Sequence, residues 1–182
     1  EREVKSLLGL DHPHVTRVLD ADVTAEVPFL VLPWLSGGSL DDRLARTGAP
    51  MSAAEVLAWL PDVARALDFI HRRGFVHRDV KPGNVLFDGA GIAFLGDFGI
   101  ARAVDGGDAT LTQTGMIVGS PKFLAPEVAA GSAAGPSSDQ YALATVVYLA
   151  LSGQLPHVAD TPLVLVAQKV AMPPRPLQEL AP

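Results

Sequence analysis

The chain of 182 residues contains no cysteine, and only 19% of its residues are charged. Without thiols it can form neither a disulfide framework nor a thiolate metal site, which excludes small disulfide-stapled scaffolds and zinc fingers. Its 14 basic residues are outnumbered by 20 acidic ones, and the formal net charge is −6. Such a balance gives no general attraction to nucleic acid or to an anionic membrane surface, so we expect no nucleic-acid partner.

Long hydrophobic runs are also lacking. The longest strongly apolar run, Tyr141 to Leu151, is shorter than the roughly 20 residues that span a bilayer, and it predicts a buried core helix. A hydrophobic content of 48% fits one packed domain of this length. The chain opens directly in a helical pattern and closes in a proline-rich stretch at 173–176, so we expect it to be part of a longer protein.

Apolar periodicity predicts an α+β fold class. Short strands are expected at 15–19, 29–32, 75–76, 85–87 and 92–95. Helices are expected at the start of the chain, after the two capping boxes that begin at Ser39 and Ser52, and over 139–151 and 161–171. Pro61 should kink the helix that follows Ser52, and Gly74 should end it. The stretch 97–127 lacks a sustained period and is expected to be a long functional loop.

A cluster of chemically active side chains lies between two of the expected strands, in the run His77-Arg78-Asp79-Val80-Lys81-Pro82-Gly83-Asn84. It places a carboxylate, an ammonium and a carboxamide on one tight loop. A second carboxylate, Asp97, follows another strand. Phosphoryl transfer needs such groups: oxygen ligands for divalent cations, a base for a hydroxyl, and a cation near the transferred charge.

Three motifs in this order resemble those of the eukaryotic-like protein kinases, and most closely the bacterial serine/threonine kinases. The run 77–84 is similar to the catalytic loop, Asp97-Phe98-Gly99 to the metal-binding DFG motif, and Ala125-Pro126-Glu127 to the APE motif. The resemblance implies a protein kinase-like fold over 1–182. It implies a partial N-lobe with helix C and the following strands at about 1–32, a hinge at 33–38, and most of the helical C-lobe at 39–182. The glycine-rich loop, the strand with the ATP lysine and the last C-lobe helices are expected to be absent.

The resemblance also implies the catalytic roles. Asp79 would accept or orient the proton of the attacking hydroxyl, and Lys81 would steady the γ-phosphate of ATP. Asn84 and Asp97 would hold Mg²⁺, which bridges the phosphates and offsets their charge.

The family pattern further implies the nucleotide contacts. Glu3 would pair with the ATP lysine, and Leu32 would be the gatekeeper of the adenine pocket. The carbonyl of Pro33 and the backbone N–H of Leu35 would bond adenine, since a proline retains its carbonyl. Leu86 would form the floor of that pocket.

Regulation is implied by the same resemblance. Thr112 and Thr114, with Thr110 nearby, occupy the loop between the DFG and APE motifs and would be phosphorylated. A phosphothreonine paired with Arg78 would order this loop. Ser120 stands where threonine is more usual, and its hydroxyl would bond Asp79 and Lys81, as expected for Ser/Thr substrates.

Other residues of these motifs are expected to be structural. His77 is interpreted as a core histidine rather than a catalyst, and Asp139 as the anchor beneath the catalytic loop. His12 and His14 have the spacing of metal ligands, but turn and strand-entry roles are favoured because no third ligand is nearby. Gly96 is expected to loosen the strand end before Asp97.

The leading hypothesis is a serine/threonine protein kinase catalytic domain that transfers the γ-phosphate of ATP, with Mg²⁺, to protein hydroxyls. This chain alone should be inactive, because the phosphate-covering loop is missing. Partners would be protein substrates and a second kinase copy for autophosphorylation. The catalytic part would be cytoplasmic, where ATP is, and the parent protein could be membrane-anchored. The alternatives are a pseudokinase binding module and, less favoured, a small-molecule phosphotransferase.

Overall fold

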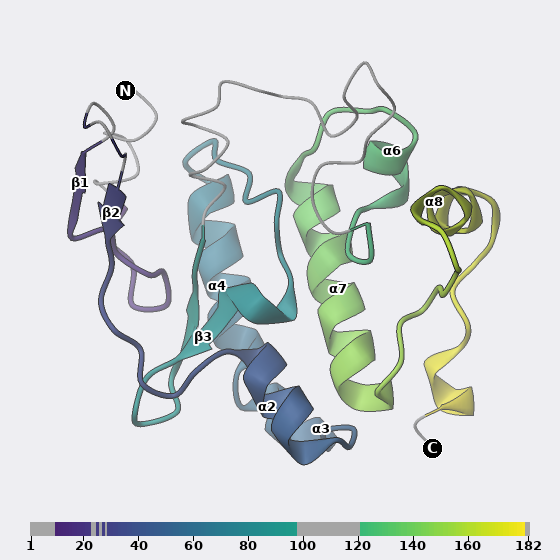
Figure 1. Cartoon of the computed structure of the whole chain (residues 1–182), viewed down its shortest axis with the longest axis horizontal. Coiled ribbons are helices and arrows are strands. Elements are labelled where there is room, and N and C mark those ends of the chain that lie inside the picture. Colours follow the sequence, from purple (N-terminus) through teal and green to yellow (C-terminus); the bar gives the residue numbers. More distant parts are fainter. Residues whose placement is uncertain (1–9, 23–24, 26, 28, 98–120, 181–182) are drawn as a thin grey trace.

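The computed structural model describes residues 10–22, 25, 27, 29–97 and 121–180. Helices and two small antiparallel sheets make up this part of the chain, so the predicted α+β class is confirmed. Figure 1 shows one sheet at the left edge of the molecule, helices α4 (Leu60–His71) and α7 (Pro136–Ser152) in the middle, and α8 (Pro162–Ala171) at the right.

The first sheet pairs β1 (Asp20–Asp22) with β2 (Phe29–Val31), and Asp20 lies opposite Val31. The expected strand at 15–19 is wrong in its position, because β1 begins only at Asp20. Val15 instead forms an isolated parallel bridge with Leu95.

The reason for this shift is that the backbone of residues 15–19 is shared between two sheets. The N–H of Thr16 donates to the carbonyl of Leu95 at 2.9 Å, whereas the N–H of Leu19 donates to the carbonyl of Val31 at 2.8 Å. The run therefore crosses from the end of one sheet to the start of the other.

The second sheet is the hairpin of β3 (Val85–Phe87) and β4 (Ala93–Leu95), close to the predicted bounds. The carboxylate of Asp88 accepts the N–H groups of Ala90 and Ile92, both at 2.9 Å, and so closes the turn. The expected strand at 75–76 is wrong: this segment belongs to no strand of the described chain.

Both predicted capping boxes are present. Ser39 caps α2 (Leu40–Thr47) and Ser52 caps α3 (Ala53–Leu57). The single helix expected after Ser52 is wrong, because a turn at residues 58–59 separates α3 from a second helix, α4. Pro61 lies in the first turn of α4, where its missing N–H has no intrahelical partner to lose, so it starts a helix instead of kinking one.

The remaining elements follow the predictions more closely. Gly74 adopts a left-handed conformation with φ 79° after α4, as expected. Helix α7 begins three residues earlier than predicted, and α8 matches its expected range. The short elements are η1 (Pro82–Asn84), α6 (Pro126–Ala129) and η2 (Leu177–Glu179).

The core lies between α4, α7 and the β3–β4 hairpin. Its fully buried side chains come from all three elements: Val63, Ile70, Phe87, Leu95 and Val146. Burial of each large aliphatic side chain stabilises the fold by about 1.5–3 kcal/mol. This packing fixes the hairpin against α4 and thereby the loop that precedes β3.

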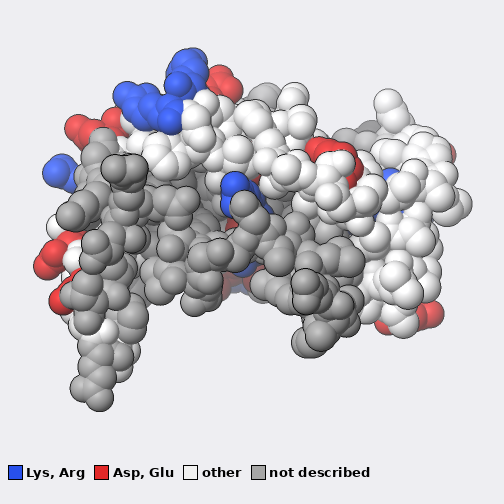
Figure 2. Space-filling model, turned by 90° about the horizontal axis from the view of Figure 1, so that it is seen from above, with Lys and Arg blue, Asp and Glu red and all other residues white. Residues whose placement is uncertain are grey.

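The surface reflects the low charge content of the sequence. Figure 2 shows a face on which most described side chains are uncharged, with basic side chains gathered at one margin. None of the helices in the described ranges is long and apolar enough to cross a membrane.

Candidate active site

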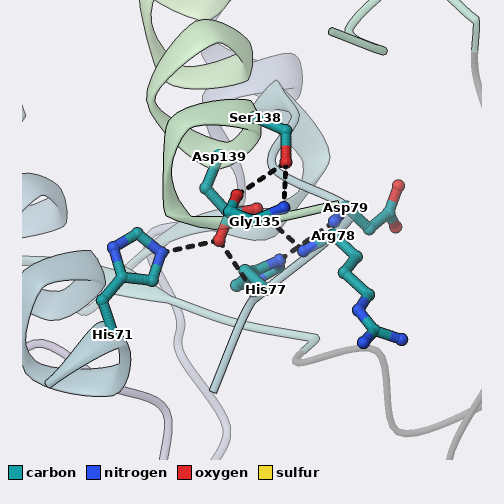
Figure 3. Close-up of polar contacts among 7 residues, drawn as sticks. All are labelled: His71, His77, Arg78, Asp79, Gly135, Ser138 and Asp139. Carbon is teal, nitrogen blue, oxygen red and sulfur yellow. Dashed lines mark hydrogen bonds and ion pairs between the residues drawn. The ribbon is translucent and has the colours of Figure 1, made fainter. Parts of the chain in front are cut away.

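A buried carboxylate on α7 holds the loop at 77–84, hereafter the catalytic loop. Asp139 is 1% exposed. Its Oδ2 accepts the backbone N–H of His77 at 2.7 Å, and its Oδ1 accepts the N–H of Arg78 at 2.8 Å. Because a carboxylate only accepts, His71 Nε2–H donates to the same Oδ2 at 2.8 Å. Figure 3 shows Asp139 between His71 and the loop, and the expected anchor is therefore present.

The N-terminal turn of α7 explains why Asp139 sits there. Ser138 Oγ accepts the N–H of Gly135 at 2.8 Å and donates to its carbonyl at 2.6 Å, which closes the turn. An acidic side chain in a first helical turn also interacts favourably with the helix dipole. His71 ends α4, so the ends of two helices meet at one carboxylate.

His77 links the catalytic loop to the end of β4. The carbonyl of Gly96 accepts from its Nε2–H at 2.8 Å, and its Nδ1 accepts the N–H of Asp79 at 3.3 Å. The ring therefore carries one proton, on Nε2, and is neutral. Burial lowers the pKa of His77, which supports the same protonation state. The interpretation of His77 as a core histidine is confirmed.

Two of the three predicted catalytic side chains, Lys81 and Asn84, contact the third, Asp79. Lys81 Nζ lies 2.6 Å from Asp79 Oδ2, and Asn84 Nδ2 donates to the same oxygen at 3.1 Å and to the Asp79 carbonyl at 2.7 Å. Asn84 is buried, while the Asp79 and Lys81 side chains are 39% and 37% exposed. Buried contacts thus orient a carboxylate that a substrate can still reach.

Two residues of the site adopt the left-handed region that non-glycine residues rarely occupy. Arg78 has φ 66° and Asp97 has φ 51°. Such conformations cost about 1–3 kcal/mol and persist where the surroundings hold them, often at functional sites. At Arg78 the bond from its N–H to Asp139 supplies that hold. In Figure 3 the side chains of Arg78 and Asp79 point away from Asp139, so the anchor binds backbone and leaves both side chains for other contacts.

Asp97 lies next to the catalytic loop. The N–H of Gly96 donates to the carbonyl of Asn84 at 2.8 Å, which brings the end of β4 beside η1. The expectation that Gly96 loosens this strand end stays a prediction, and the structure shows a packing role for the same residue. A Cβ at this position would lie 2.7 Å from Leu86 Cδ1 and 3.3 Å from Leu86 Cγ, so the glycine permits close packing.

The residues expected to contact adenine lie on two parts of the chain. Leu32, Pro33 and Leu35 are half-buried on the segment between β2 and α2, and Leu86 is half-buried on β3. Beyond Leu35, the N–H of Gly37 donates to the carbonyl of Phe87 at 2.9 Å, which joins the predicted hinge to β3. The expected site residues Glu3, Thr110, Thr112, Thr114 and Ser120 lie outside the described residues, as do Phe98 and Gly99.

The histidine pair near the start of the chain has the structural role that was favoured. His14 Nδ1 contacts the carbonyl of Ala93 at 3.0 Å, and its Nε2 lies 3.3 Å from Asp62 Oδ1. His12 Nδ1 accepts the N–H of His14. The described residues contain no group of three His, Cys, Asp or Glu side chains that could hold a metal ion.

Two residues with buried polar contacts are not predicted from the sequence. His71 donates to the Asp139 anchor. Lys169 is 5% exposed and bonds backbone carbonyls of the segment before Ala125. A signal existed for Lys169: it is spaced i, i+4 from the buried Leu165, so both side chains occupy one face of α8.

Comparison with known protein families shows which family this chain belongs to. The model of the protein kinase domain matches residues 1–173. The chain belongs to the protein kinase family. The predicted protein kinase-like fold and the resemblance to this family are therefore confirmed, and the anchored catalytic loop belongs to that fold.

The similar curated proteins are bacterial serine/threonine kinases. The chain is 40% identical over 180 residues to "Serine/threonine-protein kinase PknA" of Mycobacterium tuberculosis. This match covers 96% of this chain and 41% of that protein. It is 35% identical over 180 residues to PknB of Mycobacterium leprae and 34% identical over 179 residues to PknB of M. tuberculosis. Both matches cover 96% of this chain and 28% of the relative. The chain thus spans well under half of the length of these relatives.

Proposed function

We propose that the chain carries the catalytic loop of a serine/threonine protein kinase, which transfers the γ-phosphate of ATP to hydroxyls of protein substrates. The observation that supports it best is the convergence of Lys81 and Asn84 on the Asp79 carboxylate. Phosphoryl transfer depends mainly on positioning and electrostatic stabilisation, and this arrangement supplies both.

In the proposed reaction Asp79 orients the substrate hydroxyl and receives its proton as the oxygen attacks the γ-phosphorus. Lys81 lies against the same carboxylate and offsets the negative charge on the transferred phosphoryl group. Asn84 fixes the carbonyl and the carboxylate of Asp79, which limits the rotation of the base. The oxygen that leaves is the bridging oxygen of the β-phosphate, so ADP is the second product.

The side chains near the catalytic loop fit Mg²⁺. The amide nitrogen of Asn84 is engaged with Asp79, which leaves its carboxamide oxygen as the atom suited to a cation. The exposed carboxylate of Asp97 lies beyond Gly96, whose N–H bonds the carbonyl of Asn84. Mg²⁺ prefers such oxygen ligands. Asn84 and Asp97 would hold the ion, which when bound neutralises phosphate charge.

The remaining features of the proposal rest on the family resemblance. Residues 1–32, 33–38 and 39–182 would form the N-lobe part, the hinge and the C-lobe part, and Glu3 would pair with an ATP lysine. Leu32, Pro33, Leu35 and Leu86 would surround adenine. Phosphorylation of Thr112 and Thr114, by a second copy of the kinase, would order the loop through Arg78. The catalytic part would act in the cytoplasm.

The test is a phosphotransfer assay on the full-length protein with labelled ATP, Mg²⁺ and a generic basic protein as acceptor. Wild type should label the acceptor and itself, and Asp79→Asn should lower the rate by at least about a hundredfold, because the base is lost. Asp68→Asn, a matched change at an exposed position on α4, should leave the rate unchanged. Residues 1–182 alone should transfer no phosphate.

Three outcomes would contradict the proposal. Phosphate transfer that persists in Asp79→Asn would remove Asp79 from the mechanism. A wild type that binds ATP–Mg²⁺ but labels only small alcohols would indicate a small-molecule phosphotransferase. A wild type that neither binds ATP nor labels any acceptor would indicate a pseudokinase module.

A further inference from the structure

The most unusual buried group outside the catalytic loop is Lys169 on α8. Its side chain is 5% exposed, yet it forms no ion pair with a carboxylate within the described residues. Its Nζ donates to the carbonyl of Lys122 at 2.7 Å and to the carbonyl of Leu124 at 2.8 Å. The Tyr141 ring on α7 lies on the same side, with its centroid 5.4 Å from Nζ.

Burial of an ammonium is costly unless its donors are satisfied. A leucine or methionine would fill the same space on α8 without that cost. Burial lowers the pKa of Lys169 to about 8, so near neutral pH the group is mostly charged. The neighbouring His157 is 8% exposed, and burial followed by the charge of Lys169 lowers its pKa. The two carbonyls and the aromatic ring are therefore the groups that stabilise the ammonium.

The two carbonyls belong to a segment that needs such support. Residues 121–125 form no helix or strand, so their carbonyls lack the repeating partners that a helix or strand supplies. The segment leads directly into α6, which begins at Pro126. One side chain from α8 thus fixes two alternate carbonyls of an irregular segment.

The position of this segment gives the contact a functional meaning, which rests on the proposed function. Residues 121–125 follow Ser120, which would bond Asp79 and Lys81, and end at the first residue of the APE motif. In the proposed function, the loop that ends at the APE motif meets the protein substrate. We propose that Lys169 is a positioning residue for the protein substrate, which fixes residues 121–125 in the conformation that receives the peptide.

The contact predicts an effect on substrate binding more than on chemistry. Lys169→Met keeps the length of the side chain but has no donor, so segment 121–125 becomes mobile and peptide binding must order it. We expect the KM for a peptide substrate to rise about tenfold, which corresponds to about 1.4 kcal/mol. The KM for ATP and kcat should change less than about twofold, because neither depends on this segment in the proposal.

The experiment uses the full-length protein in four forms: wild type, Lys169→Met, Lys169→Arg and the control Gln168→Met. Gln168 is the neighbouring half-buried residue on α8 and tests the effect of a buried methionine there. Initial rates are measured against peptide at saturating ATP and against ATP at saturating peptide. Lys169→Arg retains a charged donor and should recover at least half of the lost peptide affinity in free-energy terms, whereas Gln168→Met should match wild type.

A second readout does not depend on catalysis. Lys122 is exposed, and trypsin can cut the bond between Lys122 and Phe123 once the segment opens locally. Cleavage at this bond under native conditions should be about tenfold faster in Lys169→Met than in wild type. Mass spectrometry of the fragments identifies the site and separates it from cleavage elsewhere.

The outcomes distinguish the two proposals. If Lys169→Met is active and keeps the wild-type peptide KM, the positioning role is overturned. It is also overturned if both KM values rise, kcat falls and Lys169→Arg restores none of them. In both cases the proposed function stands. If cleavage after Lys122 is as fast in Lys169→Met as in wild type, Lys169 does not hold segment 121–125 in place. If wild type transfers no phosphate, the proposed function fails, and the substrate role of Lys169 fails with it. This holds even if the cleavage rates show that Lys169 holds segment 121–125.

Discussion

Replacement of Asp139 by asparagine should release the catalytic loop from its buried anchor. Oδ2 accepts from His71 and His77, and Oδ1 accepts from the N–H of Arg78. An asparagine keeps one acceptor and places an NH₂ group at the other position, so either orientation turns a donor toward at least one buried N–H. A bond to a charged group is worth about 1.5–3 kcal/mol, and an unsatisfied buried donor costs about 1–3 kcal/mol. We expect Asp139→Asn to lower the free energy of unfolding by about 3 kcal/mol.

Chemical unfolding followed by tryptophan fluorescence measures this loss. Trp59 is 2% exposed and Trp34 is 90% exposed, so the signal change on unfolding comes mainly from Trp59. The exposed change Asp68→Asn is the control and should stay within about 0.5 kcal/mol of wild type. A loss below about 0.5 kcal/mol in Asp139→Asn would refute the reasoning, because it would mean that these donors find other partners.

Three further changes test other parts of the structure. Thr16 Oγ1 is buried and has no partner among the described residues, so Thr16→Val should raise the free energy of unfolding by about 1 kcal/mol; an unchanged or lower value in chemical unfolding would reveal a partner. Gly96→Ala should displace Leu86 and weaken ATP binding several-fold, as measured by calorimetry. An unchanged affinity would mean that Leu86 does not contact the nucleotide. The folded-state pKa of about 8 for Lys169 lies below its ordinary value of 10.5, so the unfolded state binds more protons between these values and stability rises with pH there. Relative to Lys169→Met, wild type should gain about 2 kcal/mol from pH 7 to pH 10, and parallel stability curves would contradict the lowered pKa.

Local signals allowed part of the fold to be predicted. The capping boxes at Ser39 and Ser52 involve residues three apart, and both form as expected. Gly74 adopts the left-handed conformation for an equally local reason, because the chain must turn after α4. The three side chains predicted to be catalytic could be grouped from sequence because they share one short loop, and the structure brings them together.

Features that depend on distant partners could not be predicted in the same way. The run 15–19 has the composition of a strand, but its hydrogen bonds are divided between Leu95 and Val31. Pro61 predicted a kink within one helix, whereas the structure ends α3 at Leu57 and places Pro61 in the first turn of α4. Helix α8 could be predicted from its sequence, but the structure exposes several of its apolar side chains: Leu163, Val164 and Val170. The choice of buried face is made by the neighbouring elements.

Asp139 and Lys169 show one physical principle with opposite charge. An irregular segment lacks the repeating backbone hydrogen bonds of a helix or strand, so its buried backbone groups need partners from elsewhere. In the catalytic loop the N–H groups of His77 and Arg78 are taken by a carboxylate, and in segment 121–125 two carbonyls are taken by an ammonium. Each charged group projects from a helix that packs beside the segment it holds. Removal of either charge should therefore loosen backbone near the site while the apolar core stays packed, which would separate loss of activity from loss of fold.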